Sequence, residues 1–206
     1  YNKVLAITIS SGLSGTYNML NLLAGNIRDL DIYVYDTKNI AIGSGFSAIQ
    51  AAKYIEQGMD WKTLKYTMEA ETAKSKVFYC LDTLEYLQKG GRIGLVTAML
   101  GTALNLKPII SCNAEGVYYT VAKVRGRQQS LKKVLDMAVQ FAGNSKKYNV
   151  ALIGSGLPGL NDAASIRDQV LQKLPFRDTL IEGELGCCLG VHVGPGLVGV
   201  GVQILD

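Results

Sequence analysis

The first third of the chain alternates β-rich apolar runs with segments whose apolar residues recur at helical spacing. Residues 3–10 (KVLAITIS) and 31–37 (DIYVYDT) have the pattern of strands. Helices are predicted over 16–27, 42–58 and 60–73, the last with Asp60 as its N-cap. Because parallel neighbouring strands need a crossover that is usually helical, this order predicts βαβ units and a parallel sheet.

The pattern changes after residue 75. A strand at 76–82 and a short helix at 83–90 are followed by an apolar helical stretch at 96–104. Residues 107–113 and 116–126 then have the pattern of two strands joined as a hairpin.

The last part of the chain alternates again. The segments predicted there are a helix at 128–143, a strand at 148–155, a helix at 160–173, a strand at 178–185 and a Gly-rich closing segment at 186–205. Together with the hairpin, they predict a mixed or antiparallel sheet with helices on one side. The expected fold class is α/β, with a parallel βαβ domain at 1–75 and a second α/β domain at 76–206.

The composition narrows the function classes. Of the 206 residues, 48% are hydrophobic and 18% are charged, so something apolar beyond an ordinary core is expected. No run approaches a membrane span and the first residues lack a leader pattern, which predicts a soluble, cytoplasmic protein. The net charge of +4 is spread along the chain without interleaved aromatic residues, so no nucleic-acid partner is expected.

The cysteines and the single histidine give no metal pattern. No CxxC spacing occurs among Cys80, Cys112, Cys187 and Cys188, and His192 is the only histidine. We therefore expect reduced, buried thiols and no metal site.

The segment SSGLSGT (10–16) joins a strand to a helix, the place where open α/β sheets bind ligands. Ser10, Ser11, Ser14 and Thr16 can donate hydrogen bonds, and a helix N-terminus adds partial positive charge. This predicts a site for an anion, either a carboxylate or a phosphate. An equally weighted alternative is that Ser14 only caps the helix and the glycines only form the turn.

For three other polar residues, the residue type alone favours a solvated or structural role. Arg92 follows the helix stop Gly90–Gly91, where a solvated arginine is the default, and Arg125 ends a strand in KVRG, where solvent is again the default. His192 lies between valines in GVHV, which predicts an apolar strand and a satisfied core histidine.

Two other function classes remain open at this point. A serine hydrolase or acyltransferase would use Ser11 or Ser14 as nucleophile and His192 as base, although the GxSxG elbow is absent. A small regulatory module would bind a phosphorylated metabolite at the serine turn. GSGLPG (154–159) lacks the ending of a P-loop and is interpreted as a strand-to-helix connection.

Taken together, five segments in order resemble the DegV family. They are SSGLSGTYN, LDTLEYLQKGGRIG, LGTALNLKPII, KVRG and GVHVGPG, reaching from residue 10 to residue 196. The resemblance implies a DegV-like two-domain α/β fold with one fatty acid buried between the domains. It also implies a non-catalytic carrier that presents the fatty acid carboxylate to an ATP-dependent fatty acid kinase.

The resemblance also implies residue roles. Ser10, Ser11, Ser14, Thr16 and His192 correspond to ligands of the carboxylate, and Arg125 to their neighbour. Arg92 corresponds to a contact for the kinase. The expected ligand is a long-chain fatty acid, with no catalytic residue, metal or cofactor, and with transient contact with a membrane surface as a further expectation.

The sequence departs from the family pattern at its start. Family members carry an additional N-terminal stretch that helps to hold the carboxylate, and this sequence begins at Tyr1 without it. Part of the first domain and of the head-group site is therefore expected to be missing from these 206 residues.

Overall fold

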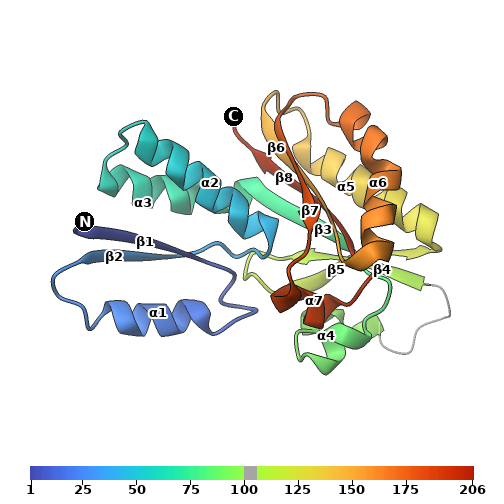
Figure 1. Ribbon diagram of the computed structural model, residues 1–206, viewed down its shortest axis with the longest axis horizontal. Helices are drawn as coiled ribbons and strands as arrows, with labels where there is room; N and C mark the ends of the chain where they lie inside the picture. The colour runs from blue at the N-terminus through green and yellow to red at the C-terminus, as the bar shows by residue number, and fades with distance from the viewer. Residues whose placement is uncertain (100–105) are drawn as a thin grey trace. The chain divides into compact units, whose positions relative to one another are not determined.

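The structure is a computed structural model that describes residues 1–99 and 106–206 (Figure 1). It divides into two compact units. The first holds Tyr1–Ser75 and Cys112–Val117, and the second holds Lys76–Ser111 and Tyr118–Asp206. The main division follows residue 75, where the hydrophobic pattern changes, but the short segment at 112–117 belongs to the first unit.

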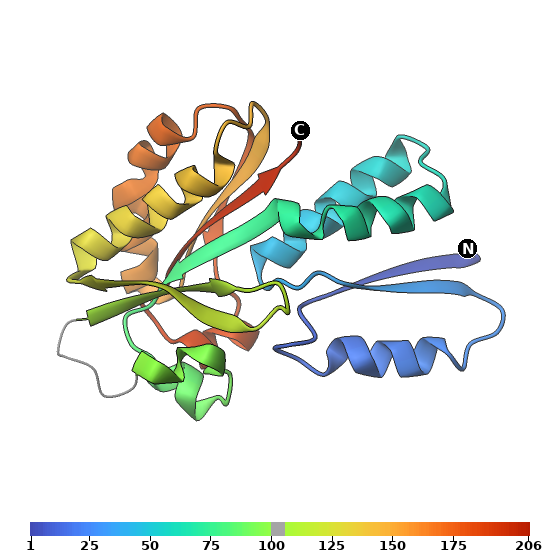
Figure 2. The ribbon, with the colours of Figure 1, turned by 180° about the vertical axis from the view of Figure 1, so that it is seen from behind.

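The first unit is built on a two-stranded parallel sheet. Its elements are β1 (Lys3–Thr8), α1 (Thr16–Ala24), β2 (Asp31–Asp36), α2 (Ile42–Glu56), α3 (Trp61–Ala70) and the 3-10 turn η1 (Thr72–Lys74). Helix α1 lies on one face of the sheet, and α2 and α3 lie on the other (Figures 1 and 2). The predicted βαβ organisation is confirmed.

The face of this sheet toward α2 and α3 carries the buried core of the first unit. Tyr35 of β2 packs there with Ala51, Leu64 and Met68 from the two helices. Helix α3 begins at its expected cap, because Asp60 accepts hydrogen bonds from the backbone N–H groups of Lys62 and Thr63 at 3.0 and 3.1 Å. The burial of these side chains holds both helices on the sheet.

Helix α1 differs from α2 and α3 in burying no residue. Its large apolar side chains Met19, Leu22 and Leu23 are exposed, Leu22 to 75%. This helix therefore owes little of its stability to packing within the unit.

The second unit contains a six-stranded mixed sheet in the order β5-β4-β3-β8-β6-β7. Its elements are β3 (Ser75–Cys80), α4 (Glu85–Lys89), the 3-10 segment η2 (Gly94–Met99), β4 (Leu106–Cys112), β5 (Tyr118–Arg125), α5 (Arg127–Ala142), β6 (Tyr148–Gly154), α6 (Gly156–Lys173), β7 (Arg177–Glu184), α7 (Cys187–Val193) and β8 (Val198–Ile204). Strand β6 pairs parallel with β7 and antiparallel with β8, as the prediction of a mixed sheet requires.

Helices α5 and α6 cover one face of this sheet (Figures 1 and 2). Alternate strand residues such as Val150 and Leu152 point toward them, because successive side chains of a strand face opposite sides. Leu131, Leu135 and Ala138 supply the matching apolar stripe of α5 at helical spacing.

Two element predictions need correction. Residues 187–193 form helix α7, so the prediction that His192 lies in a strand is wrong. The short run GVHV fits either period, and Gly194, with φ of +73°, ends the segment as a helix stop. Helix α6 begins at Gly156 and not at residue 160, because Pro158 is tolerated in a first helical turn.

The predicted apolar helix at 96–104 falls partly outside the described residues. The segment Gly94–Met99, which is described, forms η2. Residues 100–104 of the predicted helix, and residues 100–105 of the segment LGTALNLKPII, lie outside the described residues.

Two of the four cysteines contradict the expectation of buried thiols. Cys80 and Cys112 are buried, whereas Cys187 and Cys188 are exposed at the start of α7.

None of the helices in the described ranges is long and apolar enough to cross a membrane.

Candidate functional site

The serine turn and the loop after β2 lie side by side because β1 and β2 are parallel and end together. Thr8, the last residue of β1, is in register with Asp36, the last residue of β2. Beyond them the Ser10 N–H donates to the Asn39 carbonyl at 2.7 Å, and the Thr37 hydroxyl donates to the Thr8 carbonyl at 2.8 Å. The carboxyl edge of this sheet thus brings two polar loops into contact.

Ser10 is fully buried, and its hydroxyl is engaged on both sides. Its Oγ donates to the Gly116 carbonyl at 2.8 Å and accepts from the Gly12 N–H at 3.0 Å. A serine hydroxyl has one proton, so Ser10 has none left to donate to a ligand in this arrangement. Ser10 therefore joins the serine turn to the turn at 113–116.

Gly12 and Gly116, the two residues that bond to Ser10, lie too close to neighbouring atoms to carry a side chain. Gly116 has φ of +78°, and a Cβ added to it would overlap Ser10 Oγ. A Cβ added to Gly12 would lie 2.9 Å from the Gly116 carbonyl oxygen. Only glycine fits at these two positions without displacing the backbone.

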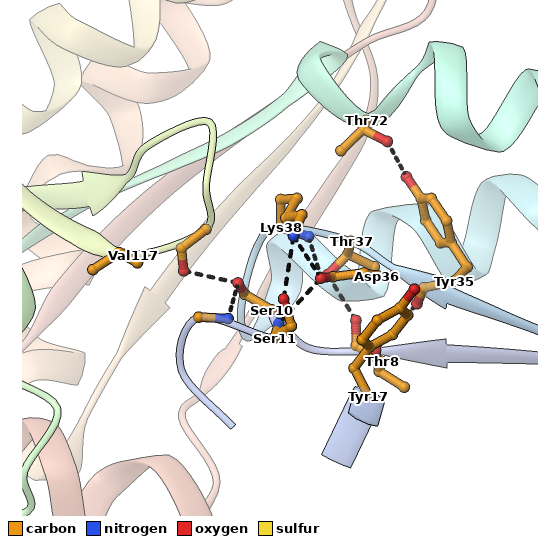
Figure 3. A network of polar contacts seen from close by, with 12 residues as sticks. Thr8, Ser10, Ser11, Tyr17, Tyr35, Asp36, Thr37, Lys38, Thr72 and Val117 are labelled. Carbon is orange, nitrogen blue, oxygen red and sulfur yellow. Dashed lines mark hydrogen bonds and ion pairs between the residues drawn. The ribbon is translucent and has the colours of Figure 1, made fainter. Parts of the chain in front are cut away.

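Ser11, Asp36 and Lys38 form a charged cluster next to this contact (Figure 3). The Asp36 carboxylate accepts from the backbone N–H of Ser11 at 3.2 Å and of Lys38 at 3.0 Å. The Lys38 ammonium pairs with Asp36 Oδ2 at 2.8 Å and donates to Ser11 Oγ at 3.1 Å. Ser11 Oγ is therefore an acceptor toward Lys38, and the Ser11 side chain also hydrogen-bonds to the Asp36 carboxylate.

Asp36 is ionised at neutral pH despite its small exposed fraction of 8%. Burial acts to raise the pKa of Asp36, but the hydrogen bonds from Lys38 and Ser11 together outweigh it and hold this pKa below the ordinary value. A fixed negative charge consequently lies within the predicted anion site.

Ser14 and Thr16 form a separate hydroxyl pair at the start of α1. Their side-chain oxygens lie 2.8 Å apart, and Ser14 Oγ also accepts from the Thr16 N–H at 3.3 Å. The N-cap residue, Gly15, contributes no side-chain bond. Ser14 is therefore not the N-cap of α1, although it bonds to the first helical residue, and it remains partly accessible.

His192 lies in the last turn of α7, with its ring against α4. Its Nδ1 is buried and has no hydrogen-bond partner among the described residues. A Cβ added to Gly90 would overlap this atom, so the absence of a side chain at Gly90 makes room for the imidazole.

Arg92 lies beside the same glycine. Helix α4 ends with Gly91 at φ of +67°, and the Arg92 N–H bonds to the Leu87 carbonyl at 2.9 Å. The exposed Arg92 guanidinium donates from Nη1 to the Gly90 carbonyl at 2.9 Å. His192 and Arg92 are therefore brought together around Gly90, although their predicted roles differ.

Arg125 is the exposed last residue of β5, and its side chain makes no hydrogen bond or ion pair with the described residues. Arg127, two residues later, is the engaged arginine of this segment. It pairs with Asp162 at 2.7 Å and donates to the Gly196 carbonyl at 2.5 Å. It thereby ties α5 and α6 to the loop that follows α7.

The four predicted hydroxyl residues fall into two groups, Ser10 with Ser11 and Ser14 with Thr16, and sequence reasoning missed Asp36 and Lys38. The four hydroxyl residues belong to the first unit, and Arg92, Arg125 and His192 belong to the second. The polar run DTKN directly after a strand was the available signal, since it ends a parallel strand as the serine turn does.

As for metals, no group of three or more His, Cys, Asp or Glu in residues 1–99 and 106–206 could hold an ion.

Comparison with known proteins gives one consistent family. A sequence model described as "Uncharacterised protein, DegV family" matches residues 1–204. A DegV domain-containing protein of Clostridium perfringens is 37% identical over 206 residues, covering 98% of this chain and 71% of that protein.

Solved structures agree with the sequence comparison. A DegV family protein from Thermus thermophilus, described by its fatty acid binding, has a TM-score of 0.91 at 28% identity and covers 99% of this chain and 71% of its own. A fatty acid binding DegV family protein from Streptococcus agalactiae has a TM-score of 0.89 at 27% identity, covering 100% and 71%.

The buried Ser10 hydroxyl predicts a stability effect confined to the first unit. Ser10→Ala should lower the free energy of unfolding by about 1–3 kcal/mol, because Gly116 and Gly12 each lose a buried partner. Ser14→Ala, which removes a more exposed hydroxyl, should cost less than about 1 kcal/mol. Urea unfolding followed by Trp61 fluorescence reports on this unit, since Trp61 is the only tryptophan. Equal losses in the two variants would refute the special role of Ser10.

The contact between Gly90 and His192 predicts a second effect. Gly90→Ala should displace the imidazole and destabilise the second unit by about 1–3 kcal/mol through overpacking. Gly190→Ala is the control, because an added Cβ there meets nothing within 4 Å and should stabilise α7 slightly. Thermal unfolding measures the stability, and the NMR signals of the only histidine report its position. Unchanged histidine signals in Gly90→Ala would contradict the contact.

Proposed function

The chain belongs to the DegV family, and on this premise we propose that it is a carrier that binds a single long-chain fatty acid without catalysing a reaction on it. The observation that supports this most is the close match over the whole chain to DegV structures described as fatty acid binding. The high apolar content agrees with an apolar ligand, since each buried methylene would contribute about 0.8 kcal/mol of affinity.

The proposed head-group site uses the hydroxyls of the serine turn. Ser11 is partly exposed beside the Lys38 ammonium, and Ser14 and Thr16 present a second hydroxyl pair. Hydroxyl donors suit a carboxylate, which only accepts hydrogen bonds when ionised. Within the predicted set, Ser10 contributes by holding the turn, because its proton is donated to Gly116.

His192 and Arg125 complete the proposed set of carboxylate ligands. The support for His192 is a ring held in place against α4 at Gly90, which limits its orientations. The support for Arg125 is an exposed guanidinium without a partner in the described part of the chain. A guanidinium matches a carboxylate in charge and geometry.

We further propose that a fatty acid kinase phosphorylates the bound ligand. The partner would supply ATP and transfer its terminal phosphoryl group to a carboxylate oxygen, giving an acyl phosphate and ADP. Exposure of Arg92 next to a rigid helix stop supports its use as a contact for this partner. Transient contact with a membrane surface, as a source of the fatty acid, remains a prediction.

The first test is mass spectrometry of an organic extract of the purified, folded protein. A fatty acid at about one equivalent per chain is expected, because a ligand buried along its acyl chain should survive purification. Re-addition of fatty acid to delipidated protein should restore the same ratio. If neither native extract nor reloaded protein holds fatty acid, the carrier function is refuted.

A burst experiment separates the carrier from a serine hydrolase. An ion-paired lysine ammonium donates to Ser11 Oγ and so does not remove a proton from it, which argues against Ser11 as an activated nucleophile. With an activated acyl ester, no burst of released alcohol is expected. A burst that disappears in Ser11→Ala and Ser14→Ala would favour the hydrolase.

Arg92→Ala should leave fatty acid binding unchanged and slow formation of acyl phosphate by the kinase, because the guanidinium contacts the partner and not the ligand. The comparison variant is Arg28→Ala, which removes an exposed arginine from the first unit. Fatty acid content and kinase turnover are measured on the same preparations. Loss of bound fatty acid in Arg92→Ala would contradict the docking role.

A further inference from the structure

We propose that the outer edge of β1 and an exposed apolar face of α1 together bind a further strand and helix of the same polypeptide, which lead into β1 from its N-terminal side. The proposal concerns the architecture of the first unit and holds whichever ligand the protein binds. The residues that carry it all belong to that unit.

Helix α1 has two apolar faces, of which one is uncovered. Tyr17, Leu20 and Ala24 recur at i, i+3 and i+7 and are half-buried, as expected for the face toward the sheet. The second face consists of exposed apolar side chains at helical spacing, which are Met19, Leu22 and Leu23. The nine residues of α1 include no charged side chain. Because so short a helix is not stable in water by itself, two apolar faces indicate that it packs on two sides.

Strand β1 is the edge of its sheet. Within the described residues β1 pairs with β2 alone, so the backbone groups on its other side have no strand partner there. Its sequence, KVLAIT, carries a single charge, and Val4 is exposed to 38%. Natural edge strands are usually short, charged or covered, and a two-stranded sheet is marginal by itself. The outer edge of β1 is therefore suited to pairing with one more strand.

The handedness of strand connections decides on which face the added helix lies. The crossover from β1 to β2 passes through α1, on the face opposite α2 and α3 (Figures 1 and 2). A strand added outside β1 and connected into β1 would cross the sheet in the same direction. Because crossovers between parallel strands are right-handed in nearly all proteins, its helix would lie on the same face as α1 and be its neighbour there.

A strand with its helix matches both parts of this surface. The strand would pair with the backbone groups at the outer edge of β1, and the helix would cover the apolar face of α1. A lipid surface would cover α1 but would leave those backbone groups without partners. The occupant is therefore a protein segment that contains both elements.

The relatives compared above contain enough additional chain to supply this segment. This chain covers 71% of the Clostridium perfringens protein and 71% of the Thermus thermophilus protein, which leaves 29% of each outside the match. A βαβ unit needs about 30 residues or more. A connected segment of the same polypeptide would bind at high effective concentration, which a separate partner lacks.

The experiment measures the accessibility of α1 in the 206 residues described here and in the polypeptide as its gene encodes it. The exposed Cys187 and Cys188 are first replaced by serine. Leu22→Cys reports on α1, and Tyr66→Cys of α3 is the matched control, since both side chains are exposed to 75%. In the polypeptide encoded by the gene, a maleimide should label Leu22→Cys about tenfold or more slower than Tyr66→Cys. In the 206 residues the two rates should agree within about twofold.

Three results would overturn the proposal. The first is equal labelling of Leu22→Cys and Tyr66→Cys in the polypeptide encoded by the gene. The second is protection of Leu22→Cys in the 206 residues that grows with protein concentration, which would assign the face to a second copy. The third is protection only with vesicles of phosphatidylcholine and phosphatidylglycerol, which would assign it to a lipid surface. Leu23→Cys repeats the measurement on the same face, so that a folding defect of one variant does not decide the result.

Discussion

The candidate site depends on a single buried hydroxyl. Ser10 Oγ bridges the Gly12 N–H and the Gly116 carbonyl, and it can do so only because both glycines lack a Cβ that would block the approach. This bridge fixes the backbone that begins with Ser11. The Ser11 N–H then reaches Asp36, which in turn holds Lys38. A shift of the turn would disturb each of these contacts in sequence, because each is anchored on the one before it.

Parallel pairing of β1 and β2 makes this arrangement possible. Strands that run in the same direction and end in register deliver both following loops to one edge, where hydroxyls, a carboxylate and an ammonium meet without a buried uncompensated charge. The resulting surface is polar but nearly neutral.

The strands and long helices of both units were predictable from the sequence, because burial of one face makes apolar residues recur at the spacing of a strand or of a helix. His192 was placed in the wrong element, since four residues cannot distinguish helix from strand. The role of Ser10 could not be predicted, because its acceptor lies 106 residues away. Arg125 and Arg127 look alike in KVRGR, and only the fold shows which one is paired.

The first unit is discontinuous, since it includes Cys112–Val117 as well as the N-terminal residues. During synthesis, the turn carrying Ser10 leaves the ribosome long before Gly116 does. The serine turn therefore reaches its final geometry only after the hairpin of β4 and β5 has been made. Completion of the binding loop is in this way tied to the progress of translation, and a growing chain would acquire the site late although its residues are among the first to appear.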